Sequence, residues 1–209
     1  AFDCGATNWR LFRFVYEWNG NQANLISEPQ ASPLTSFSDR KLPAVLCLNN
    51  SGSGLESFGD VAQQQLEDEK KRIRIRESFK PCIGSHLESN ALPHQTRYTH
   101  AESMTYTQLM LTALLDQLKK EKWRSAAFDE QLWFTFAYPI HWRYDHEGTI
   151  FDEFQQLVRG CFPQGFEHIR FVAEPEGALL SLQRQGMLNA NPGEKMLIID
   201  MSGSSSDIV

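Results

Sequence analysis

The second half of the chain alternates helix-like and strand-like patterns, and this alternation constrains the fold more than any other feature. Apolar residues recur at helical spacing in some segments, and continuous or alternating apolar runs typical of strands lie between them. The order is helix 106–123, strand 132–140, helix 149–162, strand 168–175, helix 176–186 and strand 195–203. Strands separated by helices are typical of parallel pairing, because the intervening helix returns the chain to the same end of the sheet. The sequence therefore predicts a layered α/β domain with a partly parallel sheet.

The first half has a different pattern, with short strands joined by turns. Strand, turn and strand are expected over 1–16, a strand over 42–49, a turn at 51–54, a short extended piece over 55–59 and a helix over 60–70 with Asp60 as its N-cap. Isoleucine alternates with arginine over 71–80, which predicts a strand with one solvated face. The polar sequence over 85–101 predicts an irregular segment on the surface.

Composition excludes several classes of partner. The 209 residues carry a net charge of −6 and 11% aromatic residues, which is typical of a globular protein and argues against a broad surface for nucleic acid or anionic membrane. No apolar run approaches the roughly 18 residues that span a bilayer. The beginning "AFDCGATNWRLFRF" has no basic leader followed by a continuous apolar run, so no signal peptide is expected and a cytoplasmic location is predicted.

Cysteines and histidines give no pattern of a metal or disulfide framework. Cys4, Cys47, Cys82 and Cys161 are scattered without a C-x-x-C pair, so free thiols in a reducing compartment are expected. His141 and His146 are five residues apart, which does not match the i, i+4 spacing of a helical zinc site.

Two turns each join an apolar strand and an aspartate to small or hydroxylated residues. Asp3 leads into Gly5 to Asn8, and Asp200 leads into Ser202 to Ser205. Small residues let backbone N–H groups approach an anion, and a carboxylate beside a phosphate requires a cation such as Mg²⁺ between them. Two such hairpins facing each other would hold a polyphosphate from both sides. Either turn taken alone is also explained as an ordinary flexible turn.

Six segments in order resemble the actin, sugar-kinase and 70-kDa heat-shock ATPase superfamily, and most closely a divergent member of the heat-shock (DnaK-like) family. "FDCGATN" resembles the first phosphate loop, and "LPAVLCL" with "FGDVAQQQ" resembles the following strand and helix start. "FKPCIG" resembles the segment with the catalytic lysine, and "FAYPIHW" the proline element. "AEPEGALLS" resembles the E-P-x-A-A element, and "LIIDMSGSSSDIV" the second phosphate loop.

The resemblance implies a role for each matching residue around Mg²⁺ and ATP or ADP. Asp3 and Asp200 would hold Mg²⁺ through water, Lys80 would meet the γ-phosphate and the attacking water, and Glu174 would orient that network. The phosphate loops would be formed by Gly5, Ala6, Thr7 and Asn8 and by Ser202, Gly203, Ser204 and Ser205. Lys80, Glu174 and Asp200 are thus the expected catalytic residues.

The same resemblance implies a ribonuclease H-like (actin-like ATPase) fold, a mixed sheet flanked by helices, and mainly its first lobe. Residues 1–193 would form lobe I, with 85–105 as a reduced surface subdomain, and 194–209 would be the first strand and phosphate loop of a truncated lobe II. The implied function is an ATP-binding switch of a chaperone-like protein with protein clients or partners.

Departures from the family pattern keep other functions open. Ala6 removes a hydroxyl from the first loop, and Ser202 and Ser204 replace two glycines of the second, so nucleotide binding is better supported than hydrolysis. A catalytically inactive pseudo-ATPase used as a scaffold, an actin-like filament protein and a sugar kinase are the alternatives, because one fold supports all of them.

Overall fold

The centre of the molecule is a mixed sheet in which the first strand of the chain is paired with strands from its second half. The computed structural model describes residues 1–13, 16–18, 20, 23–25, 30–31, 41–84, 97–120, 133–164, 166–188, 197–201 and 206–208. Across this part, the sheet has the order β11 (Ile169–Ala173), β10 (Phe134–Tyr138), β1 (Phe2–Cys4), β2 (Asn8–Arg13) and β5 (Gln30–Ala31), and β6 (Leu42–Pro43) also pairs with β2. Strands β11, β10 and β1 are parallel, whereas β2 is antiparallel to β1.

Aromatic side chains hold β1 against β10. Phe134, Phe136 and Tyr138 alternate along β10 and all three are buried on one face, as the period of two requires. Phe2 stacks on Phe136 with ring centroids 4.7 Å apart and lies 5.8 Å from the ring of Phe134. Large buried rings supply much of the apolar area that stabilises this parallel pairing.

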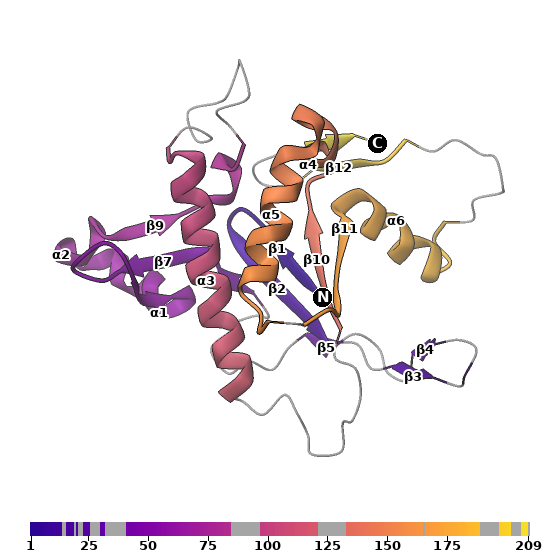
Figure 1. Ribbon diagram of the computed structural model, residues 1–209, viewed down its shortest axis with the longest axis horizontal. Coiled ribbons are helices and arrows are strands. Elements are labelled where there is room, and N and C mark those ends of the chain that lie inside the picture. Colours follow the sequence, from indigo (N-terminus) through magenta and orange to yellow (C-terminus); the bar gives the residue numbers. More distant parts are fainter. Residues whose placement is uncertain are drawn as a thin grey trace.

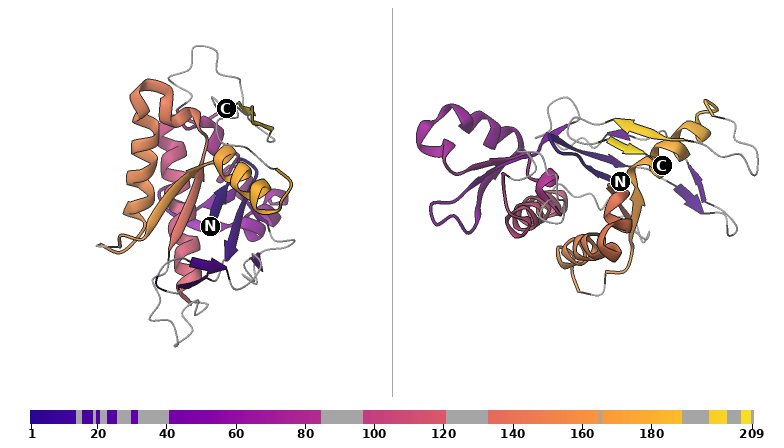
Figure 2. Two further views of the ribbon diagram at one scale, coloured as in Figure 1. Left: turned by 90° about the vertical axis from the view of Figure 1, so that its right-hand side faces the viewer. Right: turned by 90° about the horizontal axis from the view of Figure 1, so that it is seen from above.

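Helices cover both faces of the sheet. The long helix α3 (His100–Lys120) and α5 (Thr149–Gly160) pack on the face that carries the buried aromatic rings, and α6 (Glu174–Arg184) contacts β10 and β11 from the opposite face (Figures 1 and 2). Leu111, Leu114, Leu115 and Leu118 of α3 are buried at helical spacing. The predicted layered α/β architecture with a partly parallel sheet is therefore confirmed.

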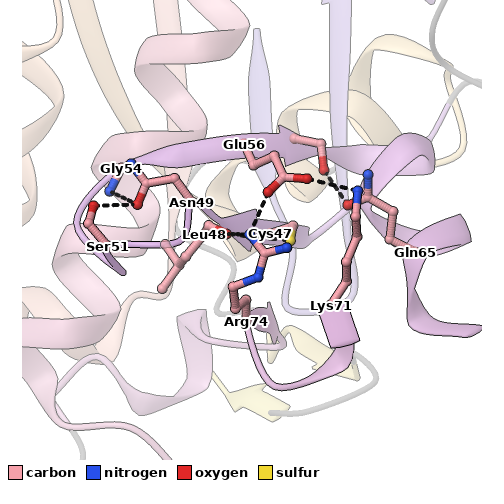
Figure 3. A network of polar contacts seen from close by, with 10 residues as sticks. Cys47, Leu48, Asn49, Ser51, Gly54, Glu56, Gln65, Lys71 and Arg74 are labelled. Carbon is pink, nitrogen blue, oxygen red and sulfur yellow. Dashed lines mark hydrogen bonds and ion pairs between the residues drawn. The ribbon is translucent and has the colours of Figure 1, made fainter. Parts of the chain in front are cut away.

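A smaller antiparallel sheet lies beside the main one. It has the order β8 (Leu55–Phe58), β7 (Val45–Leu48), β9 (Ile75–Glu77), and it carries α1 (Gly59–Gln64), the 3₁₀ turn η2 (Gln65–Glu67) and α2 (Glu69–Arg72). Figure 3 shows the polar network on this sheet: the Glu56 carboxylate accepts from Lys71 at 2.8 Å and from Arg74, and Arg74 also donates to the Leu48 carbonyl at 2.9 Å. These bonds tie β8 and β7 to α2 and to Arg74, which follows it.

Two predicted segments in this region were wrong in extent. The predicted strand 71–80 is only three residues long, because Asp68 caps a short helix that continues to Arg72 and leaves Ile73 largely exposed. The predicted helix 60–70 ends as an α-helix at Gln64 and continues only as a 3₁₀ turn before Asp68, which is extended. Asp60 is not its N-cap as predicted, because the helix begins at Gly59 and Phe58 occupies the N-cap position.

The predicted helix 106–123 begins six residues earlier, at His100, so the expected irregular segment does not continue to Ala101. Thr99 and Glu102 form a capping box, in which the Glu102 carboxylate accepts from the Thr99 N–H at 2.8 Å and the Glu102 N–H donates to the Thr99 hydroxyl at 3.2 Å. Residues 85–96, the rest of the predicted irregular segment, lie outside the described residues.

Short elements complete the fold. They are the hairpins β3 (Tyr16–Trp18)–β4 (Ala23–Leu25) and β12 (Ile199–Met201)–β13 (Ser206–Ile208), the helix α4 (His141–Tyr144) and the 3₁₀ turns η3 (Lys80–Cys82) and η5 (Asp145–Gly148). Among the described residues no helix has the length and apolar character needed to cross a membrane.

Replacing Phe136 by alanine is expected to lower the free energy of unfolding by about 3–5 kcal/mol, because it opens a cavity under the ring of Phe2. Chemical denaturation followed by circular dichroism measures this change. Leu180→Ala, at an exposed position on α6, is the control and should change stability by about 0.5 kcal/mol or less. Equal effects of the two substitutions would contradict the assigned core.

Candidate functional site

The candidate site lies where the three parallel strands end. The carboxyl ends of β1, β10 and β11 meet at one edge of the sheet, and the chain continues there into the turn after Cys4, into Pro139 and into Glu174. Proline follows each of the two later strands closely, because it cannot continue the ladder but suits the start of a helix. Ligands of α/β sheets typically bind at such an edge.

An ion pair joins two residues that are far apart in the sequence. The ammonium of Lys80, in η3, donates to the carboxylate of Glu174, the first residue of α6, at 2.6 Å across a sequence separation of 94 residues. The two side chains are only 9% and 16% exposed, so water screens the pair weakly. Lys80 also lies 5.8 Å from the centre of the Trp142 ring, within the range of a cation–π contact.

The end of β1, which carries Asp3 and Cys4, lies near the Lys80–Glu174 ion pair. Burial raises the pKa of the Cys4 thiol to about 12, the positive charge of Lys80 opposes this shift, and the negative charges of Asp3 and Glu174 add to it. All three charged groups therefore act on one buried sulfur atom. Asp3 lies between the buried residues Phe2 and Cys4 in a strand, so its side chain points to the face opposite the aromatic core.

The first predicted phosphate loop is a tight turn between β1 and β2. A Cβ added at Gly5 would lie 2.5 Å from the Asn8 carbonyl oxygen, so this position requires glycine. The Thr7 carbonyl accepts from the Ala44 N–H at 2.9 Å, and the Asn8 side chain donates to the Thr7 hydroxyl at 3.2 Å. Ala6 is half-buried and offers no hydroxyl at this turn.

A short hydrogen-bonded path connects this turn to Lys80. The same residue, Ala44, accepts through its carbonyl from the Ser78 N–H at 3.4 Å. Ser78 has φ of +51°, a left-handed conformation that is costly for a residue with a side chain and that turns the chain from β9 into η3. The first turn and the lysine segment are thus both attached to the backbone at Ala44.

The second predicted phosphate loop is described only in part. Strand β12 pairs with β13 so that Asp200 lies opposite Asp207, and Ser202, Gly203, Ser204 and Ser205 lie outside the described residues. Strand β12 contacts α6, the helix that begins with Glu174, and it lies at the same end of the sheet as α4 (Figure 1). The backbone therefore brings β12 to the side of the molecule that carries the candidate site.

The sequence did not single out two residues of this region. Trp142 is buried in α4 beside Lys80, but a tryptophan after a proline gives no signal of that role. His100 bonds to Gly84 and Glu153 behind the lysine segment, and the T-x-x-E capping box at Thr99 would have placed it correctly at a helix start.

The remaining predictions concern cysteines and histidines. All four cysteines are free thiols. His141 lies in α4 with its ring 6.3 Å from that of Trp142, and the structure describes no side chain for His146. Among the described residues, no group of three or more His, Cys, Asp or Glu side chains is placed to hold a metal directly.

Comparison with known proteins gave no relative: no family model matches the chain, and no curated protein matches it.

A double-mutant cycle tests the central ion pair. Lys80→Met and Glu174→Gln should each destabilise the protein by about 3 kcal/mol, because each leaves a buried charge without its partner, and the two changes should show a coupling energy of about 1–3 kcal/mol. The same cycle on the exposed pair Lys119 and Asp116 is the control, and its coupling should be about 0.5 kcal/mol or less. Additive effects at Lys80 and Glu174 would show that the two groups do not interact.

Alkylation tests the environment of Cys4. With a pKa of about 12, on the order of one Cys4 thiol in 10⁴ is ionised at pH 8, against about one in ten for an exposed thiol, and burial also blocks the reagent. Native protein treated with iodoacetamide should therefore remain unmodified at Cys4 while the half-buried Cys161 reacts first. Mass spectrometry of peptides gives the order, and rapid native modification of Cys4 would contradict the buried position.

Proposed function

We propose that this chain is the ATP-binding domain of a divergent 70-kDa heat-shock-like protein, with an actin-like ATPase fold of the ribonuclease H type. The observation that carries the proposal is the contact of Lys80 with Glu174 beside the turn that follows Asp3. The resemblance assigns these residues to one site although they come from distant segments, and a chance resemblance gives no reason for them to meet.

The chemistry of the site suits phosphoryl transfer, which requires positioning and charge neutralisation more than covalent participation by the protein. Lys80 would donate to the γ-phosphate and to the attacking water. Glu174 would hold the ammonium in place before the nucleotide arrives and then orient the water, because its carboxylate already bonds to Lys80 at 2.6 Å. The low exposure of both side chains strengthens these interactions.

The carboxylate of Asp3 at this edge also fits a hydrated Mg²⁺. The carboxylate of Asp3, which points away from the aromatic core, and that of Asp200 would hold the ion through its water molecules, as is usual for Mg²⁺ with few protein ligands. When bound, Mg²⁺ supplies positive charge that neutralises the phosphates. The first turn would then contribute backbone N–H groups from Gly5, Ala6 and Thr7 to the same phosphates.

At the level of the whole protein, the proposed role is a nucleotide switch. Bound ATP or ADP would shift the population between two lobe arrangements that a client or partner protein distinguishes. The proposed location is the cytoplasm, where four free cysteines remain reduced. Neither nucleic acid nor membrane is a proposed partner.

A pseudo-ATPase that acts as a protein-binding scaffold is the second candidate. The ammonium of Lys80 already contacts Glu174 and Trp142, so a phosphate would have to share this ammonium with them. Ala6 also offers no hydroxyl to a phosphate at the first turn. No observation on the described residues favours an actin-like filament protein or a sugar kinase.

Calorimetric titration with Mg-ATP, run beside a phosphate-release assay, separates the two candidates. We expect binding that depends on Mg²⁺, and a phosphate release that falls at least about 100-fold in Lys80→Met because transition-state charge is no longer neutralised. Asp200→Asn should lower the dependence of binding on Mg²⁺.

Lys119→Met, which removes an exposed lysine on α3, is the matched control and should leave both readouts unchanged. Binding without release in the unmodified protein would indicate a nucleotide-gated switch that does not hydrolyse ATP. A folded protein that binds no nucleotide at millimolar Mg-ATP would contradict the proposal and favour the scaffold.

A further inference from the structure

One imidazole ring joins the lysine segment to both helices behind it. The Gly84 N–H donates to Nδ1 of His100 at 3.0 Å, and Nε2 of the same ring lies 2.7 Å from the Glu153 carboxylate. His100 is the first residue of α3, Glu153 belongs to α5, and Gly84 follows η3, so the ring connects three elements that are separate in the sequence.

These two bonds assign the tautomer of His100. Nδ1 accepts a hydrogen bond and therefore carries a lone pair, so the hydrogen of the neutral ring is on Nε2 and is donated to Glu153. A second proton can enter only at Nδ1. That proton would point at the Gly84 N–H, and two donors cannot form a hydrogen bond with each other.

Gly84 is held firmly enough to transmit such a change. Its φ is +80°, and an added Cβ would lie 2.3 Å from the Ile150 side chain of α5, so only glycine fits and the backbone lies directly against that helix. The Ile83 N–H donates to the Lys80 carbonyl at 3.0 Å, which makes Lys80 to Gly84 one continuous turn. The ring at His100 therefore anchors the turn that presents Lys80.

We propose that His100 is a positioning residue for Lys80 and that its protonation is a pH-sensitive release. The neutral ring fastens Gly84 to α3 and α5. The protonated ring still donates to Glu153 but no longer accepts from the Gly84 N–H, so the Lys80 turn can move relative to Glu174.

Charged groups face the ring from α5 and lie near it on α3. From α5 the Glu153 carboxylate faces the ring, but its side chain is 45% exposed, so water screens its attraction for an imidazolium. On α3, the Glu102 carboxylate bonds to Thr99, and the positive end of the helix dipole opposes a charge on the first residue.

Arg97, three residues before His100, pairs with Glu77 of β9 at 3.1 Å. A groove lined by His100, Glu153 and Leu157 opens between α3 and α5, so protons from solvent have access to the ring. On this proposal the bond to Gly84 is present while the ring is neutral and is lost when Nδ1 takes up a proton.

Nuclear magnetic resonance of the ¹⁵N-labelled chain tests this without nucleotide. A scalar coupling between the Gly84 amide nitrogen and His100 Nδ1 should be visible at pH 8 and should vanish toward pH 5, in step with the imidazole ¹⁵N shifts. The protection of the Gly84 amide against hydrogen exchange, corrected for intrinsic rates, should fall roughly fivefold over the same range.

His100→Asn is the matched variant. Its side-chain oxygen can accept from Gly84 in place of Nδ1 but does not titrate, so Gly84 protection should no longer depend on pH. Glu153→Gln, which keeps an acceptor for Nε2–H without its charge, should leave the bond to Gly84 in place at pH 8. The proposal would be overturned if Gly84 protection did not change as His100 titrates in the unmodified chain. It would also be overturned if this protection depended on pH equally in His100→Asn.

The expected effect on phosphate release rests on the proposed function. The bridge, meaning the bonds of His100 to Gly84 and to Glu153, does not rest on it. If the chain hydrolyses ATP, release should decline below the titration of His100 in the unmodified protein and not in His100→Asn. Nuclear magnetic resonance that follows the expected pattern while no ATP is hydrolysed would refute the ATPase and leave the pH-sensitive bridge established. A pH-independent Gly84 in an active ATPase would refute only the bridge.

Discussion

The parallel pairing of β1 with β10 is the constraint on which the candidate site depends. It brings Phe2 into register with Phe136 and so aligns the first residues of the chain with strands from its second half. Closing so long a loop has an entropic cost that grows only slowly with length, and the stacked and edge-on rings around Phe136 offset it locally. Only because these strands run in the same direction do Asp3, Pro139 and Glu174 reach one edge of the sheet.

The ion pair at that edge differs from the aromatic core, because removing one partner is costly whereas replacing both partners together need not be. A weakly exposed lysine and carboxylate lose much of their solvation, and well-packed apolar residues of similar size often stabilise a protein as much or more. A site that binds a charged ligand would give such a pair a role besides stability. The left-handed Ser78, two residues before Lys80, supports this view, because backbone strain collects where a side chain must be presented in a fixed direction.

Much of this arrangement could be predicted from the sequence, and the limits are physical. The alternation of helix and strand after residue 106 predicted the layers correctly, because each segment had a clear apolar period. The alternation of Ile and Arg over 71–80 predicted too long a strand. The alternating signal is only a few residues long, and the capping of a short helix by Asp68 outweighs it.

Within the candidate site, resemblance selected Asp3, Lys80 and Glu174, and local patterns could not have brought them together. Trp142 and His100 were missed because their roles depend on tertiary contacts between elements that are distant in the chain. The roles assigned to the two phosphate loops stay predictions.

The small sheet has a hydrophobic cluster of its own, formed by Val45, Cys47, Ala62 and Ile75 and separate from the main core. So small a cluster buries little apolar area, although Leu46 and Leu48 of the same strand pack in the main core. Opening the cluster alone therefore costs less free energy than unfolding the whole domain. Val45 of this cluster directly follows Ala44, to which the first turn and the lysine segment are both attached, and Ile75 belongs to β9, which leads through Ser78 to Lys80. Thermal fluctuations of the small sheet therefore reach the candidate site along two backbone segments, through Ala44 and through Ser78, and the geometry around Lys80 can vary while the parallel strands remain intact.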